Sequence, residues 1–233
     1  MPNIITPEMI TQPKEIAPYI QHTKIGIGTT REQSIRHAEE AAEFGFNAAM
    51  VAGSCVPITA DVLRGTGVEI ASALDFPTTG VMTSRGKAAE AEELVRLGAT
   101  QIDIGVQIGW LKDKEYKKFR DDIAGVVEAG VPVKVMLELP LLSIEERKIA
   151  VELAIEAGAK VLKNASSGAV EKASVESIKF LKELAPEGIQ VKGSGGISTF
   201  EHALELLKAG ASLVGSSNSI AIVSGADNGA NSY

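Results

Sequence analysis

Two lysines and an aspartate stand in or at the end of short apolar segments, where ionised side chains are unusual. Lys163 and Lys192 close two such segments, and Asp103 lies within a third. A charge there is costly unless it is paired or used in chemistry. Two ammonium groups in a dry site repel each other, so one is expected to lose its proton near neutral pH and become a nucleophilic amine. Asp103 can compensate the remaining positive charge and transfer protons.

Two loops rich in glycine and serine follow two other apolar segments, at 193–199 and 214–218. Glycine lets backbone N–H groups approach an oxyanion closely, and serine hydroxyls add further donors. In barrels of parallel strands, the loops after the last two strands commonly bind phosphate. The predicted phosphate-binding residues are Ser194, Gly195, Gly196, Gly215, Ser216 and Ser217.

Other ionisable residues are weaker candidates. Lys134 and Glu138 share one face of a strand, so Lys134 has either a supporting electrostatic role or a structural ion pair with Glu138. Neither His22 nor His202 has a second ligand nearby at metal-binding spacing, so no metal site is predicted. His202 follows Glu201 on a predicted helix and is expected on the surface.

A repeating order of helices and short strands must position these residues. Helix-like segments end at glycines that suit a left-handed C-terminus, and an apolar strand follows each one. The predicted strands are 22–27, 48–52, 68–73, 101–105, 133–137, 160–164, 189–193 and 212–216. The predicted helices are 30–44, 57–64, 83–97, 114–129, 143–157, 174–185 and 199–209, with an additional N-terminal helix near 6–17.

Alternating strands and helices indicate an α/β fold with a parallel sheet. Eight strands favour closure into a (β/α)8 TIM barrel, and an open doubly wound sheet is the structural alternative. Residues 1–233 are predicted to form one domain, with a helical extension over 1–18 and a flexible tail over 225–233. Barrel active sites lie at the C-terminal ends of the strands, which is where both lysines stand.

Composition argues against several classes of protein. The net charge is −7 and there is no basic run, so a nucleic-acid partner is not expected. No apolar stretch approaches membrane-spanning length, and the N-terminus does not read as a signal peptide. The single cysteine, Cys55, excludes an intrachain disulfide, fits a reducing cytoplasm and is expected to be a small core or loop residue. A cytoplasmic location is therefore predicted.

Nearly the whole chain resembles deoxyribose-phosphate aldolase, a class I aldolase that joins acetaldehyde to glyceraldehyde 3-phosphate. The likeness is strongest in the stretches 101–112, 133–146, 157–163 and 191–197, and in Phe76-Pro77 with Gly80 and Lys87 beyond it. It implies an aldehyde-lyase that cleaves 2-deoxy-D-ribose 5-phosphate reversibly, in deoxyribonucleotide catabolism. It also implies a homo-oligomer, a dimer or tetramer, and no cofactor.

The resemblance also implies individual roles. Lys163 would form the imine with the donor aldehyde, and Lys192 would lower the pKa of the Lys163 amine. Asp103 would transfer protons with a water, and Ser166 lies in the supporting segment after Lys163. Members of the family often end in a tyrosine that assists proton transfer. Tyr233 is either that residue or the chance end of a tail.

The chain departs from the family's pattern at positions that shape the substrate pocket. Gln21 stands where an Asp is usual, Met50 lies in place of a Cys-Val-x-Pro motif, and Asn164 begins a segment that usually reads Thr-Ser-Thr-Gly. Three alternatives stay open: a Schiff-base aldolase or transaldolase-like enzyme for another phosphorylated sugar, a phosphate-binding barrel isomerase or synthase without an imine, and a non-catalytic sugar-phosphate binding protein.

Overall fold

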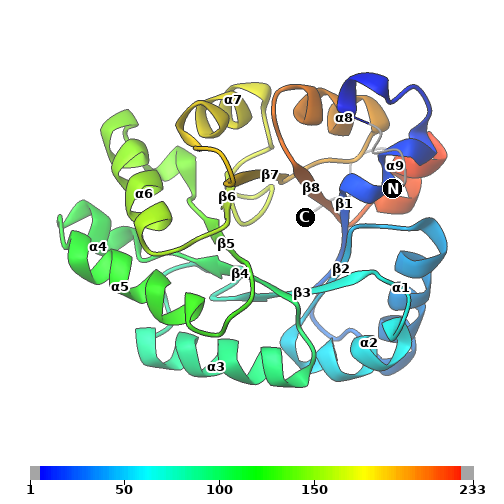
Figure 1. Cartoon of the computed structure of the whole chain (residues 1–233), viewed down its shortest axis with the longest axis horizontal. Coiled ribbons are helices and arrows are strands. Elements are labelled where there is room, and N and C mark those ends of the chain that lie inside the picture. The colour runs from blue at the N-terminus through cyan, green and yellow to red at the C-terminus, as the bar shows by residue number, and fades with distance from the viewer. Residues whose placement is uncertain (1–5, 227–233) are drawn as a thin grey trace.

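The computed structural model describes residues 6–226, in which eight parallel strands close into a barrel (Figure 1). Each strand pairs with the next along the chain, and β8 pairs with β1. This closure confirms the (β/α)8 barrel and excludes the open sheet, which would leave both end strands unpaired. The strands are β1 (Ile20–Lys24), β2 (Ala48–Val51), β3 (Glu69–Leu74), β4 (Gln101–Gly105), β5 (Val133–Met136), β6 (Val161–Lys163), β7 (Gln190–Ser194) and β8 (Leu213–Ser216).

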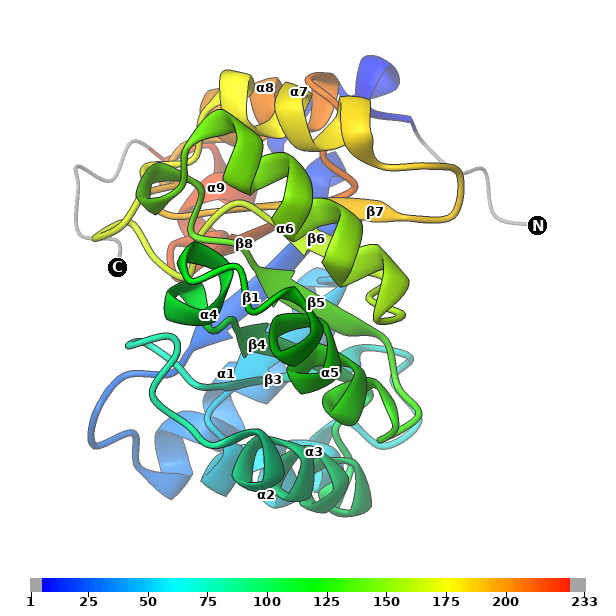
Figure 2. The ribbon, with the colours of Figure 1, turned by 90° about the vertical axis from the view of Figure 1, so that its left-hand side faces the viewer.

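Helices cover the outside of the barrel, and the side view shows α7 and α8 across the strands from α2 and α3 (Figure 2). The predicted helices all form, within two residues of the predicted ends: α1 (Arg31–Phe44), α2 (Val56–Leu63), α3 (Ser84–Leu97), α5 (Tyr116–Val127), α6 (Ile144–Glu156), α7 (Val175–Leu184) and α8 (Phe200–Lys208). The sequence did not indicate α4 (Ile108–Lys112), α9 (Ser219–Ser224) or the 3-10 helices η3 (Gly53–Cys55) and η4 (Leu139–Leu141). Within 6–226, no helix is long and apolar enough to cross a membrane.

The N-terminal helix predicted near 6–17 forms as two short 3-10 helices rather than as one continuous helix. These are η1 (Pro7–Met9) and η2 (Pro13–Tyr19), and they pack beside α8 and α9 (Figure 1). Proline lacks a backbone N–H and its ring clashes with the preceding turn of an α-helix. Pro13 therefore ends any helix that starts at residue 6, and short 3-10 turns accommodate the chain.

Strand β1 lies about two residues earlier than predicted, because the chain turns at Gly26 and Gly28 rather than continuing as a strand. Gly28 has a φ of 77°, which a side chain would disfavour. Side chains alternate between the two faces of a strand, so Gln21 and Thr23 point into the barrel while His22 points toward α1. The earlier start therefore places Gln21 inside the barrel.

A buried ion network holds the loop between β3 and α3. Lys87 Nζ lies 2.7 Å from Asp122 Oδ2 and 3.2 Å from Asp75 Oδ2, and it also donates to the Gly105 carbonyl. All three charged side chains are buried. Asp75 in turn accepts hydrogen bonds from the backbone N–H groups of the loop at 80–82. Since this loop also carries Phe76, the network fixes a wall of the strand-end cavity described below.

Replacing Lys87 with Met should destabilise the barrel, because it leaves Asp75 and Asp122 buried without a counter-charge. We expect the free energy of unfolding to fall by about 3–5 kcal/mol, measured by urea denaturation. The matched control is Lys148→Met, since Lys148 forms an exposed ion pair with Glu145. That control should change stability by at most about 0.5 kcal/mol. Equal losses in the two variants would contradict the role of the network.

Candidate active site

Three lysines meet one carboxylate inside the barrel. Asp103 Oδ1 accepts a hydrogen bond of 2.9 Å from Lys134, and Asp103 Oδ2 accepts bonds of 3.0 Å from Lys163 and 2.8 Å from Lys192. All four side chains are buried. The structure thus brings together the two lysines and the aspartate predicted from the sequence, and it adds Lys134 as a third ion-pair partner of the same aspartate.

The strand register explains how these residues meet. Asp103 on β4 lies opposite Lys134 on β5, and Lys163 on β6 lies opposite Lys192 on β7. Residues at matching positions on neighbouring barrel strands point to the same side of the sheet. Four consecutive strands therefore direct their charged side chains to one point inside the barrel.

Charge and burial act against each other in this cluster. Burial alone would raise the pKa of Asp103, but the ammonium groups of Lys134, Lys192 and Lys163 outweigh it and hold the pKa well below the usual range. Burial lowers the pKa of Lys192 well below its usual value, and the positive charges of Lys163 and Lys134 lower it further against the attraction of Asp103. Burial likewise lowers the pKa of Lys134. Asp103 therefore stays ionised as the shared counter-ion.

Lys163 and Lys192 cannot both remain charged without a large cost. Ammonium groups that share one carboxylate oxygen lie within about 6 Å of each other, where like charges repel by about 3 kcal/mol at an effective dielectric constant of about 20. Loss of the proton from Lys192, whose pKa burial lowers, removes this repulsion. The cluster therefore favours one uncharged amine beside Asp103.

Both lysines line one cavity at the C-terminal ends of the strands, which we call the strand-end cavity. Ser166 and the six predicted phosphate-binding residues line it as well. Its remaining wall is largely apolar, formed by Ile25, Met50, Ala73 and Phe76. The cavity thus joins an amine, a set of hydroxyl and backbone donors, and a surface suited to carbon atoms.

The hydroxyl groups of the cavity are not equally free to bind a ligand. Ser216 Oγ donates to the Ile197 carbonyl and accepts from the Asn218 N–H, so its capacity is used within the protein. In contrast, Ser194 Oγ is buried without a hydrogen-bond partner among the described residues. This hydroxyl is therefore the one that gains most by donating to an anion in the cavity.

Two glycines that line the cavity let other parts of the protein pack closely against its loops. Gly195 has a φ of 108°, and a Cβ there would lie 2.1 Å from the Glu171 carbonyl oxygen. A Cβ at Gly215 would lie 2.8 Å from Ser194 Oγ and 3.1 Å from Lys192 Cε. A side chain at Gly195 would displace the loop after β7. A side chain at Gly215 would displace Ser194 or Lys192.

Asn164 directly follows β6, and its side chain connects this strand to the end of β7. Its side chain accepts from the backbone N–H of Ser194 at 2.9 Å and donates to the Ser194 carbonyl at 3.0 Å. The Ser194 N–H is therefore not available to a ligand, which leaves its hydroxyl as the donor. Sequence reasoning recorded Asn164 only as a departure from the family's pattern and missed this contact.

The suggested pair of Lys134 with Glu138 is wrong. Strand β5 ends at Met136, and Glu138 has a left-handed backbone with a φ of 52°, so the two residues no longer follow one strand alternation. Glu138 Oε1 instead accepts from the backbone N–H of Ser166 at 3.0 Å. Burial raises the pKa of the Glu138 carboxyl.

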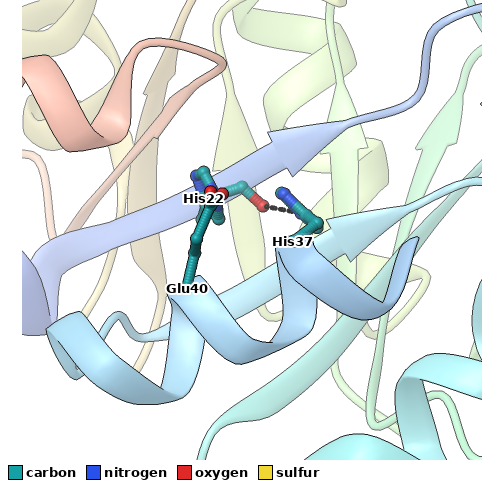
Figure 3. Close-up of side chains that lie close together, drawn as sticks. All are labelled: His22, His37 and Glu40. Carbon is teal, nitrogen blue, oxygen red and sulfur yellow. Dashed lines mark hydrogen bonds and ion pairs between the residues drawn. The ribbon is translucent and has the colours of Figure 1, made fainter. Parts of the chain in front are cut away.

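His22 does have potential metal ligands nearby, which corrects the reasoning from sequence spacing. His37 and Glu40 on α1 lie beside it (Figure 3). His22 Nε2 is 3.3 Å from Glu40 Oε2, and the two imidazole rings stack with centroids 4.0 Å apart. Burial and the charge of Lys24 lower the pKa of His22 to about 4, so the stacked rings are neutral. Nitrogen lone pairs lie in the ring planes, and stacked planes direct them side by side rather than toward one ion.

The structure contradicts the predicted surface position of His202 and confirms the predicted place of Cys55. His202 is half-buried rather than on the surface, because its Nε2 lies 2.8 Å from the Ala173 carbonyl oxygen. Cys55 is buried at the end of η3, as predicted. Tyr233 and most of the tail at 225–233 lie outside the described residues.

Replacing Asp103 with Asn should make stability strongly dependent on pH. The folded variant would hold three buried lysines with no counter-ion, so it binds protons more weakly than the unfolded chain does. Stability then rises with pH, because the unfolded state binds more protons. We expect a loss of about 3–5 kcal/mol at pH 7 that is partly regained by about pH 10, measured by urea denaturation. Exposed Asp121→Asn is the control, and parallel pH curves for the two variants would contradict the cluster.

Curated relatives and a solved structure match the chain over most of its length. The deoxyribose-phosphate aldolase of Thermococcus kodakarensis is 38% identical over 219 residues, covering 91% of this chain and 97% of the relative. That of Aciduliprofundum boonei is 39% identical, covering 90% and 96%. The tetrameric deoxyribose phosphate aldolase of Aeropyrum pernix superposes with a TM-score of 0.84 at 26% identity, covering 93% of each chain. No family model matches. The identities and coverage of the curated relatives show that this chain belongs to the deoxyribose-phosphate aldolase family.

Proposed function

We propose that the protein cleaves 2-deoxy-D-ribose 5-phosphate reversibly to acetaldehyde and D-glyceraldehyde 3-phosphate through an imine on Lys163. The observation that carries this proposal is the sharing of one Asp103 oxygen by two buried lysines at the floor of a cavity. Family membership supports the aldolase reaction, and the cluster supports the covalent route.

Lys163 is better placed than Lys192 to be the nucleophile. Among the described residues, Lys163 Nζ has one hydrogen-bond acceptor, Asp103 Oδ2, whereas Lys192 Nζ has two. The Lys163 side chain is also slightly more accessible, at 6% against 1%. A neutral Lys163 amine can therefore donate one hydrogen to Asp103 and direct its lone pair into the cavity.

The covalent steps follow from an amine meeting an open-chain sugar aldehyde. Lys163 attacks C1 to give a carbinolamine, which loses water to give an iminium. The C3 hydroxyl then loses its proton to a base, the C2–C3 bond breaks, and its electron pair moves to C2 to form an enamine. Glyceraldehyde 3-phosphate leaves, C2 takes up a proton, and water hydrolyses the iminium to acetaldehyde and free Lys163.

Asp103 and Lys192 assist these steps in different ways. Asp103 is held ionised, so it serves as counter-ion to the developing iminium and as an acceptor that can exchange protons through a bound water. Lys192 contacts the same Asp103 oxygen as Lys163 does, and it can return a proton to Asp103 and Lys163. Lys134 keeps the second oxygen of Asp103 occupied and so fixes the plane of the carboxylate.

The phosphate of the substrate would bind at the two loops that follow β7 and β8. The support is the unpartnered Ser194 hydroxyl, which lines the cavity together with the glycines of both loops. Ser217 and Gly196 line the same cavity. Ser216 contributes through the shape of its loop, since its hydroxyl is already engaged.

A related aldolase for a different phosphorylated sugar is the second candidate. Met50 lines the cavity, in place of the family's usual Cys-Val-x-Pro motif. Comparing a panel of donor and acceptor aldehydes separates the two candidates. We also propose that the chain forms a homo-oligomer, as the relative from Aeropyrum pernix does.

Borohydride reduction with acetaldehyde should attach the donor to the protein at Lys163. Peptide mapping by mass spectrometry identifies the modified lysine. Lys163→Met should abolish both labelling and turnover, whereas Lys160→Met should leave both unchanged, because Lys160 is exposed beside the same strand. Turnover without any labelling in the wild-type protein would favour a barrel enzyme that forms no imine, and labelling at Lys192 would reverse the roles of the two lysines.

Replacing Ser194 with Ala should weaken recognition of the phosphate specifically. A hydrogen bond to a charged group contributes about 1.5–3 kcal/mol, so KM for the phosphorylated sugar should rise at least about tenfold. The kcat/KM for unphosphorylated 2-deoxyribose should change little. Equal losses for both sugars would show that Ser194 shapes the site without binding phosphate.

A further inference from the structure

Gln21 connects β1 to the lysine cluster, and its orientation is fixed. The side chain is fully buried, and Nε2 donates to Asn47 Oδ1 at 3.0 Å and to Gln101 Oε1 at 2.7 Å. Both amide hydrogens are therefore used, and Oε1 accepts from Lys192 Nζ at 2.6 Å. The reverse orientation would point an N–H group at an ammonium donor. Gln21 thus presents a neutral acceptor to Lys192.

The charges around Lys192 show why a neutral acceptor matters. From the neighbouring strands, Lys192 faces the carboxylate of Asp103 and the ammonium groups of Lys163 and Lys134. On β8, Gly215 lies beside Lys192 and has no side chain. Farther out, Glu138 acts on Lys163 and Glu69 acts on Lys134. Asp103 is therefore the one carboxylate that the three lysines contact within the described residues.

We infer that Gln21 is a positioning residue for the proposed imine chemistry, because it holds Lys192 against Asp103 without adding a second negative charge to the cluster. A carboxylate of the same length at this position would contact the Lys192 ammonium directly. It would stabilise the doubly protonated lysine pair, so the pair would release its proton only at higher pH. The inference rests on the proposed function, in which one of these amines must be neutral.

The test is the pH dependence of kcat/KM for 2-deoxyribose 5-phosphate cleavage in Gln21→Glu. The variant keeps the length of the side chain, and the amides of Asn47 and Gln101 can rotate to donate to the new carboxylate. We expect the acidic limb of the profile to move up by about one pH unit, with much of the activity regained at alkaline pH. Gln190→Glu adds the same charge at the exposed start of β7 and should leave the limb in place.

Gln21→Met removes the acceptor while it keeps the bulk of the side chain, and it provides a second result if the Glu variant does not fold. We expect kcat and the rate of acetaldehyde trapping to fall at least about tenfold, because Lys192 is no longer held at Asp103. KM for the phosphorylated sugar should change little, since Gln21 does not line the cavity. A role limited to packing would lower the melting temperature of both variants and move neither the pH limb nor the trapping rate.

The outcomes separate this inference from the proposed function. If wild-type protein cleaves the sugar but gives no borohydride-trapped imine, the proposed function fails and the inference fails with it. If wild-type protein is trapped at Lys163, two results overturn the inference alone. The first is a Gln21→Glu variant whose acidic limb stays at the wild-type pH, or moves no further than the limb of Gln190→Glu does. The second is a Gln21→Met variant that keeps the wild-type kcat and trapping rate.

Discussion

The interaction on which the site depends is the contact of one aspartate with three lysines. Asp103 lies inside the barrel on β4, and its three partners come from β5, β6 and β7. A closed parallel barrel can place four such side chains at one point, because matching positions on adjacent strands face the same side. The fold is therefore the device that keeps positive charges close enough to lower the proton affinity of an amine.

Much of the fold could be predicted from the sequence because its signals are local. Capping residues such as Thr30 and Ser143 start helices where expected, and Gly45 and Gly98 end them in the left-handed conformation. The N-terminal segment forms two 3-10 helices instead of one continuous helix, because its prolines interrupt the helical pattern. The short helices α4 and α9 had too few residues to show a periodicity.

The candidate site was likewise predictable where its signal lies in one segment, and not where it depends on contacts between distant segments. Lys163, Lys192 and Asp103 were found because a charge in an apolar strand is visible in one segment of sequence. The contacts of Gln21, Asn164 and Lys87 join segments far apart in the chain, and uncharged amides give no signal of their own. His22 was misjudged for the same reason, since its neighbours lie on a helix that follows the strand.

The two hydrogen bonds between Asn164 and Ser194 bear on the length of substrate that the proposed reaction accepts. Asn164 is bonded covalently to Lys163, and Ser194 carries an unpartnered hydroxyl that lines the same cavity. The proposed reactive amine and the proposed phosphate-binding hydroxyl are therefore held at a fixed separation. For the proposed reaction, we expect a sugar one carbon shorter or longer to contact one of these two groups and miss the other, whatever hydroxyl groups it carries.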